Sequence, residues 1–260
     1  MTIAAIAAFG ALSLVLVLLR RSRSESRRLG ARLEEALANL QRLEGIFARM
    51  VPHELVERVI GGDHATVGQK REVTVLFADL VGFTGLSESL EASVLVRVLN
   101  GYFDRMTRAI VEHRGRVSTF LGDGLLALFG AFEPNPWQSD DALHAALAMR
   151  GELGAYNREL EAEGLPRLGF GVGVHRGVGV AGLVGSHERL EFAVVGGVVN
   201  VAARVQSLTR SCDADILATR EVRELADSRF LLRELPPAEL RGLRRPVQTF
   251  ALEGFQGGDA

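Results

Sequence analysis

The chain has very little cysteine, very little lysine and almost no net charge. The cysteine count and the net charge each exclude a class of function. Cys212 is the only cysteine among the 260 residues, so neither an intrachain disulfide nor a zinc site with paired cysteines can form. Lys70 is the only lysine, and arginine supplies the other basic side chains. The formal net charge of -2 provides no overall basic field, and we therefore expect no nucleic-acid partner.

An apolar run without a charged residue occupies positions 2–19. Its length falls within the roughly 17 to 25 residues that a helix needs to cross a bilayer. Arg20, Arg21 and Arg23 follow the run and no basic residue precedes it, which places the C-terminal side in the cytoplasm. A cleaved signal peptide would carry its charge before the run. We expect a transmembrane anchor over residues 1–20, with a buried core helix as the alternative.

Residues 27–60 have the composition and spacing of a helix. Leu33, Leu37, Leu40 and Phe47 fall on one a/d seam. The seam covers only about two heptads, fewer than the three or four that establish a coiled coil. Two interpretations stay open: a short parallel dimer seam, or an amphipathic helix that lies on the following domain.

Two aspartates lie where folding alone gives little reason for them. Asp79 ends the apolar run 73–78 and precedes a glycine-containing loop, whereas Asp123 lies in a Gly-Asp-Gly turn between two apolar runs. A carboxylate that closes a buried strand and another at a hairpin tip can meet at one edge of a sheet. Such pairs suit hard divalent cations, and a glycine loop that enters a helix suits polyphosphate. Alone, Asp79 could cap a turn and Asp123 could serve only the hairpin.

The apolar and polar periodicity predicts an α+β domain. Its helices are expected near 87–113, with Ser87 or Ser89 as the N-cap and a possible break, and near 140–163 and 198–208. Its strands are expected at 71–79, 116–121, 125–129, 168–174, 178–184 and 192–195, with three more near 216, 230 and 247–252. The order βαββαβ predicts a ferredoxin-like sandwich, in which the first strand and the hairpin lie side by side.

Four separate segments resemble the catalytic domain of class III nucleotidyl cyclases, the adenylate and guanylate cyclases. They are residues 73–84, 120–130, 173–185 and 194–204, in the order and at the spacing of that family. The resemblance implies a catalytic domain over 67–255, after an anchor at 1–20 and a juxtamembrane basic segment with a dimerising helix at 21–66, and before a disordered tail at 256–260. It further implies a single-pass protein of the bacterial inner membrane with a cytoplasmic catalytic domain.

The resemblance also implies roles for individual residues. The metal site, for two Mg²⁺ or Mn²⁺ ions, would comprise Asp79, Leu80 and Asp123. The phosphates of the nucleotide would bind at Val81, Gly82, Phe83, Thr84 and Arg241. Two ions about 3.5 to 4 Å apart activate a nucleophile and neutralise a leaving group, as the cyclisation of ATP to cyclic AMP and pyrophosphate requires.

Asn200 and Arg204 stand four residues apart, so both project from one face of a helix. Taken alone, the pair is a solvated helix face. In the family, the corresponding asparagine orients the ribose and the arginine stabilises charge on the α-phosphate. Family members place this pair and the metal pair on opposite subunits, which implies a homodimer with two sites.

The positions that read the purine in the family differ here. Thr119 stands where relatives have lysine, and Ala193 where they have aspartate or threonine. Gly197 replaces a common aspartate and Phe192 a tyrosine. An adenylate cyclase is the first expectation, with GTP as a second substrate. The alternative is a catalytically silent cyclase-like module that binds a nucleotide or a partner.

Overall fold

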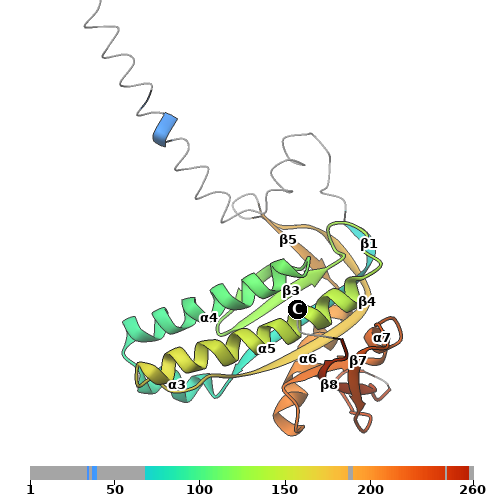
Figure 1. The fold of residues 1–260 in the computed structure, drawn as a ribbon. Helices are drawn as coiled ribbons and strands as arrows, with labels where there is room; N and C mark the ends of the chain where they lie inside the picture. Colours follow the sequence, from blue (N-terminus) through green and yellow to red (C-terminus); the bar gives the residue numbers. More distant parts are fainter. Residues whose placement is uncertain (1–33, 35–36, 40–67, 187–189, 244, 258–260) are drawn as a thin grey trace, which may run out of the picture. The chain divides into compact units, whose positions relative to one another are not determined.

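The computed structural model describes residues 34, 37–39, 68–186, 190–243 and 245–257 (Figure 1). The chain divides into two units, Met1–His64 and Ala65–Ala260, and the fold below is that of the second unit. The predicted anchor lies outside the described residues. Among the residues that are described, no helix is long and apolar enough to span a membrane.

The domain is organised around one mixed sheet, whose strands follow the order β2-β3-β1-β4-β6-β8-β7, with β5 paired to β4 (Figure 1). The strands are β1 (Gln69–Val81), β2 (Arg116–Leu121), β3 (Gly124–Phe129), β4 (Gly169–Gly185), β5 (Leu190–Val195), β6 (Ile216–Thr219), β7 (Phe230–Glu234) and β8 (Thr249–Phe255). The order β2-β3-β1-β4 is the predicted ferredoxin-like arrangement. Strand β1 pairs antiparallel with both β3 and β4, so the prediction that the first strand lies beside the hairpin is confirmed.

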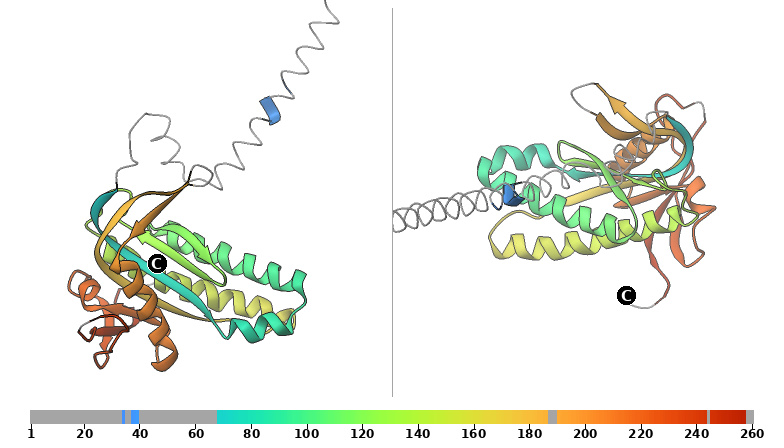
Figure 2. Two further views of the ribbon diagram at one scale, coloured as in Figure 1. Left: turned by 180° about the vertical axis from the view of Figure 1, so that it is seen from behind. Right: turned by 90° about the horizontal axis from the view of Figure 1, so that it is seen from above.

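Helices cover both faces of the sheet. They are α3 (Phe83–Ser89), α4 (Ala92–Glu112), α5 (Gln138–Ala162), α6 (Gly197–Leu208) and α7 (Arg220–Arg223), with the 3₁₀ turn η1 (Thr209–Ser211) after α6. Helices α4 and α5 lie side by side on one face, where Leu76 and Ala78 of β1 join their core, and α6 packs on the other face against Val73 and Val75 (Figure 2). The alternation of inward side chains along β1 therefore places Asp79 on the face of α6.

Two details of the predicted elements were wrong. The strands expected at 168–174 and 178–184 form one continuous strand, β4, of 17 residues. His175 lies between the two predicted strands, and its backbone continues the pairing with β1 without a turn. Its side chain is bonded as well, because Nδ1 lies 2.9 Å from Thr219 Oγ1. Neither serine caps α4: the Glu91 carboxylate accepts from the Ser93 amide at 2.9 Å.

The glycines of β4 allow α6 to approach the strand closely. A Cβ on Gly173 would lie 2.3 Å from the Gln206 nitrogen and 2.4 Å from the Ala202 carbonyl oxygen. Both are helix backbone atoms, which cannot rotate away as a side chain can. Gly173 therefore fixes the height of α6 above the sheet, and with it the position of every residue that α6 presents.

We expect Gly173→Ala to destabilise the protein by about 1 to 3 kcal/mol, because the methyl group would have to push the α6 backbone off the sheet. Gly151→Ala is the matched control, since nothing lies within 4 Å of its added Cβ in helix α5. That control should raise stability by roughly 0.5 to 1 kcal/mol, because alanine loses less entropy in a helix. Urea denaturation followed by circular dichroism measures both, and equal effects would contradict the close approach.

Candidate active site

The structure brings Asp79 and Asp123 together at one end of the sheet. Asp79 lies near the end of β1, and Asp123 lies in the turn between β2 and β3. The pairing of Ala78 with Leu125 aligns the two segments. Gly124 completes the close fit, because a Cβ there would lie 3.0 Å from Asp79 Oδ1.

The carboxylate pair creates an excess of negative charge in a partly buried place. Burial raises the pKa of Asp79, and repulsion from Asp123 raises it further, while the nearby guanidinium of Arg210 acts against both. The same two carboxylates, after burial, raise the pKa of Tyr102 on α4. The Tyr102 hydroxyl is buried and has no hydrogen-bond partner. A cation bound between the carboxylates would relieve this repulsion.

The donor set fits a magnesium or manganese ion. The described residues contain no group of three or more histidine, cysteine or acidic side chains arranged to hold a metal. Two carboxylates, with the backbone of Leu80 beside Asp79, would be the metal ligands that the protein supplies at this site. Mg²⁺ commonly binds through one or two carboxylates, completed by substrate phosphates and water. The few acidic ligands thus favour an ion that arrives with a nucleotide.

The segment after Asp79 leads into helix α3 through an exposed valine and a left-handed glycine. Val81 is 53% exposed, and Gly82 adopts a left-handed conformation with φ of 72°, which turns the chain into α3 at Phe83. No side chain caps the start of α3. The first-turn amides, at Phe83 and Thr84, have no earlier helical carbonyl to bond, so they are suited to phosphate oxygens.

Helix α6 turns Asn200 and Arg204 away from the sheet. Its buried residues are Val198, Val201, Ala202, Val205 and Gln206. Asn200 is exposed and Arg204 is half-buried. The Arg204 guanidinium nitrogens lie 3.5 and 3.6 Å from the position of a Cβ on Gly242, so Arg204 and the exposed Arg241 belong to one region.

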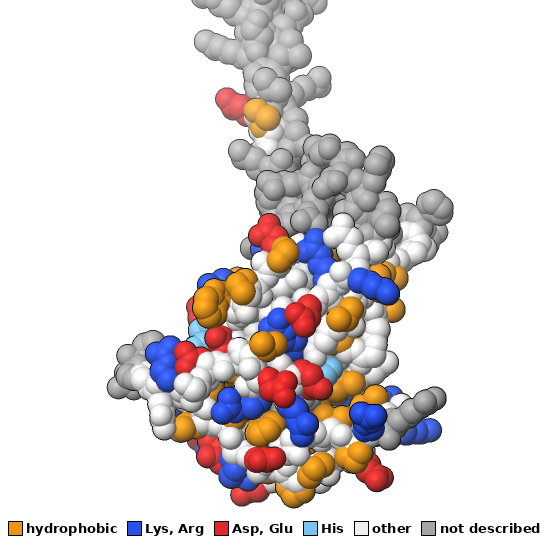
Figure 3. All heavy atoms as spheres, turned by 90° about the vertical axis from the view of Figure 1, so that its right-hand side faces the viewer, with side chains coloured by type: hydrophobic (Ala, Val, Ile, Leu, Met, Phe, Trp, Pro, Cys, Tyr) orange, Lys and Arg blue, Asp and Glu red, His pale blue; other side chains and the backbone are white. Residues whose placement is uncertain are grey.

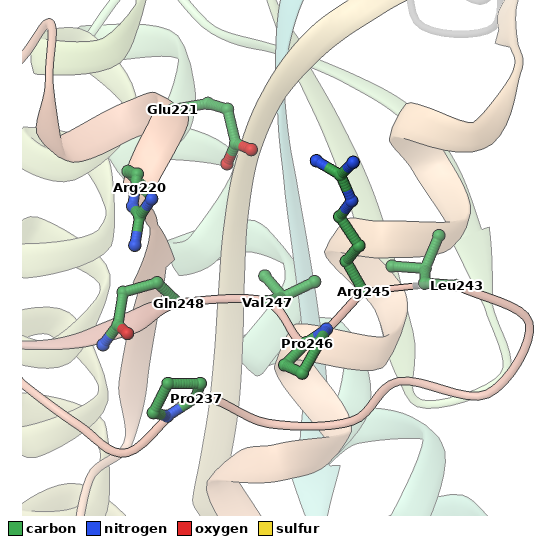
Figure 4. A pocket seen from close by; sticks show the side chains of 8 residues that line it. All are labelled: Arg220, Glu221, Pro237, Leu243, Arg245, Pro246, Val247 and Gln248. Atoms are coloured by element: carbon green, nitrogen blue, oxygen red, sulfur yellow. The ribbon is translucent and has the colours of Figure 1, made fainter.

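The loop before β8 also borders a cavity of about 700 Å³ (Figure 4). Arg245 enters it from this loop and Glu221 enters it from α7, on opposite sides of the cavity (Figure 4). On the side of the domain that bears α7, acidic and basic side chains are interspersed and neither sign dominates (Figure 3). This mixed surface agrees with the absence of a basic field in the sequence.

Asn200 and the carboxylates lie toward different ends of helix α6 and the turn η1 that follows it. Thr209 packs directly over Gly171, since a Cβ there would lie 2.2 Å from Thr209 Oγ1, and Gly171 is the register partner of Asp79. Asn200 precedes Thr209 by nine residues, which is roughly 13 Å along a helix.

The two positions predicted to read the purine lie on neighbouring segments. Thr119 is on β2 and Ala193 is on β5, and Ser118 Oγ donates to the Phe192 carbonyl at 3.3 Å between them. The Thr119 hydroxyl has a weak contact of 3.4 Å with the Phe120 carbonyl. Ala193 offers no polar side-chain atom. This place therefore supplies one hydroxyl for a base.

Sequence reasoning missed two residues beside the carboxylates, Tyr102 and Arg210. Arg210 Nη2 lies 2.9 Å from Asp79 Oδ2, although 131 residues separate them. Neither residue belongs to a local motif. The four-residue spacing that singled out Arg204 gives no signal for an arginine in the following 3₁₀ turn.

The fold and the paired carboxylates define an α+β nucleotidyl cyclase catalytic domain. Residues 66–254 match the family described as the adenylate and guanylate cyclase catalytic domain, so the chain belongs to that family. Its members act on nucleotides as lyases. The match confirms the family and the fold class that the resemblance implied.

Individual relatives include both kinds of cyclase. An adenylate cyclase of Anabaena cylindrica is 35% identical over 202 residues, which are 75% of this chain and 39% of the relative. Adenylate cyclase 1 of Rhizobium meliloti is 31% identical over 80% of this chain and 32% of the relative, so this chain spans well under half the length of these relatives. The crystal structure of the guanylyl cyclase Cya2 has a TM-score of 0.69 and 32% identity, and covers 73% of this chain and 95% of its own.

We expect Mn²⁺ to raise the melting temperature of the protein. An ion at one hundred times its dissociation constant stabilises a folded protein by about 2.7 kcal/mol. Asp123→Asn should lose most of this shift, because it removes one of the two carboxylates. Asp227→Asn is the control, since Asp227 pairs with Arg229 on the exposed surface. Differential scanning fluorimetry with and without Mn²⁺ measures the shift, and a full shift in Asp123→Asn would exclude this metal site.

Proposed function

We propose that this protein is a membrane-anchored, homodimeric adenylate cyclase that converts ATP to 3′,5′-cyclic AMP and pyrophosphate. The observation that carries the proposal is the meeting of Asp79 and Asp123 beside the uncapped start of α3. Membership of the cyclase family and the adenylate cyclases among its relatives support it.

In this mechanism each residue has a distinct task. Asp79, Asp123 and the Leu80 backbone would hold two Mg²⁺ or Mn²⁺ ions, which would supply Lewis acidity to the 3′-hydroxyl and to the leaving pyrophosphate. The amides from Val81 to Thr84 bind the β- and γ-phosphates, and Arg241 adds a positive charge to them. These interactions hold the α-phosphorus in place for attack.

The pair on α6 acts on the reacting centre. Asn200 orients the ribose so that its 3′-oxygen faces the α-phosphorus. Arg204 places a fixed positive charge where negative charge develops on the α-phosphate. The described residues include no ion-pair partner for the Arg204 guanidinium, so its charge is available to a ligand.

A second copy of the chain would complete the site. Asn200 and Arg204 face away from their own sheet, and Val178 and Val195 on the β4–β5 arm are 63% and 54% exposed. Exposed apolar residues on the β4–β5 arm and an outward-facing pair on α6 are both features of a surface that meets a second copy. The α6 face of one chain would meet the carboxylates of its partner.

The N-terminal region supports the same assembly. The apolar run of residues 2–19 would anchor the chain in the bacterial inner membrane, with the catalytic domain in the cytoplasm. Leu37, on the predicted a/d seam, is helical and 51% exposed, as a residue awaiting a partner helix would be. Two helices joined at this seam would bring the two catalytic domains together.

Complementation tests the dimer. We expect Asp79→Asn and Asn200→Ala each to abolish cyclase activity when expressed alone. Co-expressed, they form heterodimers with one intact site, and random pairing restores about one quarter of the wild-type rate. Cyclic AMP production by purified full-length chains measures this. A mixture that stays inactive while heterodimers are detected would mean that both residues act within one chain.

Product analysis with ATP and GTP tests the substrate. We expect cyclic AMP from ATP with Mn²⁺ or Mg²⁺, and none from Asp123→Ala. Base selectivity should be low, because Ala193 offers no hydrogen bond. Restoring the family residues in Thr119→Lys with Ala193→Asp should raise the preference for ATP over GTP roughly tenfold to a hundredfold, since each charged hydrogen bond contributes about 1.5 to 3 kcal/mol.

The altered purine positions favour one alternative, a catalytically silent cyclase-like module. It would bind a nucleotide or a partner and signal through the N-terminal helix. In that case a folded, metal-loaded dimer would bind ATP without turnover. Asp79→Asn would then leave the biological output unchanged, whereas an enzyme would lose it.

A further inference from the structure

Arg210 forms an ion pair with Asp79, one of the two carboxylates assigned to the metal site. Its Nη2 lies 2.9 Å from Asp79 Oδ2, while Asp79 Oδ1 faces Gly124. The Asp79 side chain is only 22% exposed, whereas that of Arg210 is 59% exposed. The arginine therefore reaches in from solvent to a carboxylate that is largely enclosed by the sheet end.

The backbone that carries Arg210 is fixed while its side chain is free to move. Thr209 is buried, and its hydroxyl donates to the Gln206 carbonyl at 2.7 Å. Ser211 donates to the Leu208 carbonyl at 2.9 Å, and closes the 3₁₀ turn on the other side. Within this turn the Arg210 guanidinium forms its ion pair with Asp79 alone among the described residues. Rotation of the side chain would break that pair without disturbing the fold.

An ordinary surface ion pair is the simplest description of this contact, and such pairs contribute little. Two observations distinguish it. The Asp123 carboxylate lies close to Asp79 and repels it, so Arg210 offsets a repulsion that an isolated aspartate would not experience. Moreover, the bonded oxygen belongs to a residue assigned to the metal, and a guanidinium and a divalent cation repel each other at such separations.

We propose that Arg210 is a placeholder cation: it neutralises Asp79 in the metal-free site, is displaced when the metal binds, and then binds the polyphosphate that arrives with the metal. This inference rests on the proposed function only for the identity of the polyphosphate. A displaced Arg210 remains anchored beside Asp79 through η1, and guanidinium groups bind phosphate oxygens in a bidentate manner. The same residue thus opposes the metal alone and favours the metal with its nucleotide.

The first test measures metal affinity without nucleotide, so that turnover plays no part. Free Mn²⁺ is quantified by electron paramagnetic resonance during titration of the full chain in detergent micelles. Arg210→Gln should bind Mn²⁺ roughly three- to thirtyfold more tightly than the wild type, because the competing charge is gone. Arg210→Lys keeps the charge and should stay within about threefold of the wild type.

Arg233→Gln is the matched control. Arg233 forms an exposed ion pair with Glu253 on β7 and β8, and three strands separate β7 from β1, the strand of Asp79. It should leave the Mn²⁺ affinity unchanged. Equal Mn²⁺ affinity in Arg210→Gln and the wild type would overturn the placeholder role.

The second test uses inorganic pyrophosphate with saturating Mn²⁺, measured by calorimetry. Arg210→Gln should weaken pyrophosphate binding roughly tenfold, because a charge-assisted contact is lost. The two effects of one substitution have opposite signs, which a merely structural role for Arg210 would not produce. Unchanged pyrophosphate affinity would overturn the transfer to polyphosphate. Neither test requires cyclic product, so failure of the proposed enzyme activity and failure of this inference are distinguishable.

Discussion

The repulsion between two adjacent carboxylates is the constraint on which the rest of the site depends. Asp79 is held by the pairing of β1 with β3 and β4, and Asp123 by a hairpin turn that Gly124 presses against it. The two carboxylates cannot move apart without a change in the backbone, because each belongs to a segment held by the sheet. Around the pair, burial and the Asp123 carboxylate raise the pKa of Asp79, the buried Tyr102 hydroxyl has no hydrogen-bond partner, and Arg210 forms an ion pair with Asp79. A cation bound between the two carboxylates would reduce their repulsion, so the fold favours cation binding at this place.

Much of this arrangement could be predicted from the sequence. The apolar run before Asp79 and the Gly-Asp-Gly turn indicate a strand and a hairpin, and the βαββαβ order places them side by side. The continuity of β4 could not be predicted, because its many glycines are typical of a break, whereas here they admit α6. The role of Arg210 could not be predicted for a different reason. Its partner Asp79 is 131 residues away, and only the tertiary fold brings the two side chains together.

The predicted purine positions and Asp79 lie on different strands of the sheet. Thr119 and Ala193 belong to β2 and β5, which the Ser118–Phe192 hydrogen bond joins, whereas Asp79 lies near the end of β1. In the resemblance, the predicted phosphate and metal positions match the family pattern, whereas Thr119 and Ala193 depart from it. Ala193 on β5 lies outside the β2–β3 hairpin that carries both Thr119 and Asp123, so the base contact at Ala193 can change without altering that hairpin.

The continuous strand β4 also limits how this domain can vary. All 13 residues of β1 pair with it, and its glycines at 171 and 173 lie under η1 and α6. Side chains alternate between the faces of a strand, so inserting one residue would exchange the faces of every residue beyond it. The glycines would then face away from α6, and bulky side chains would face the helix in their place. Changes of chain length are therefore confined to the connecting loops, and relatives of this domain should differ in their loops while β4 keeps its length.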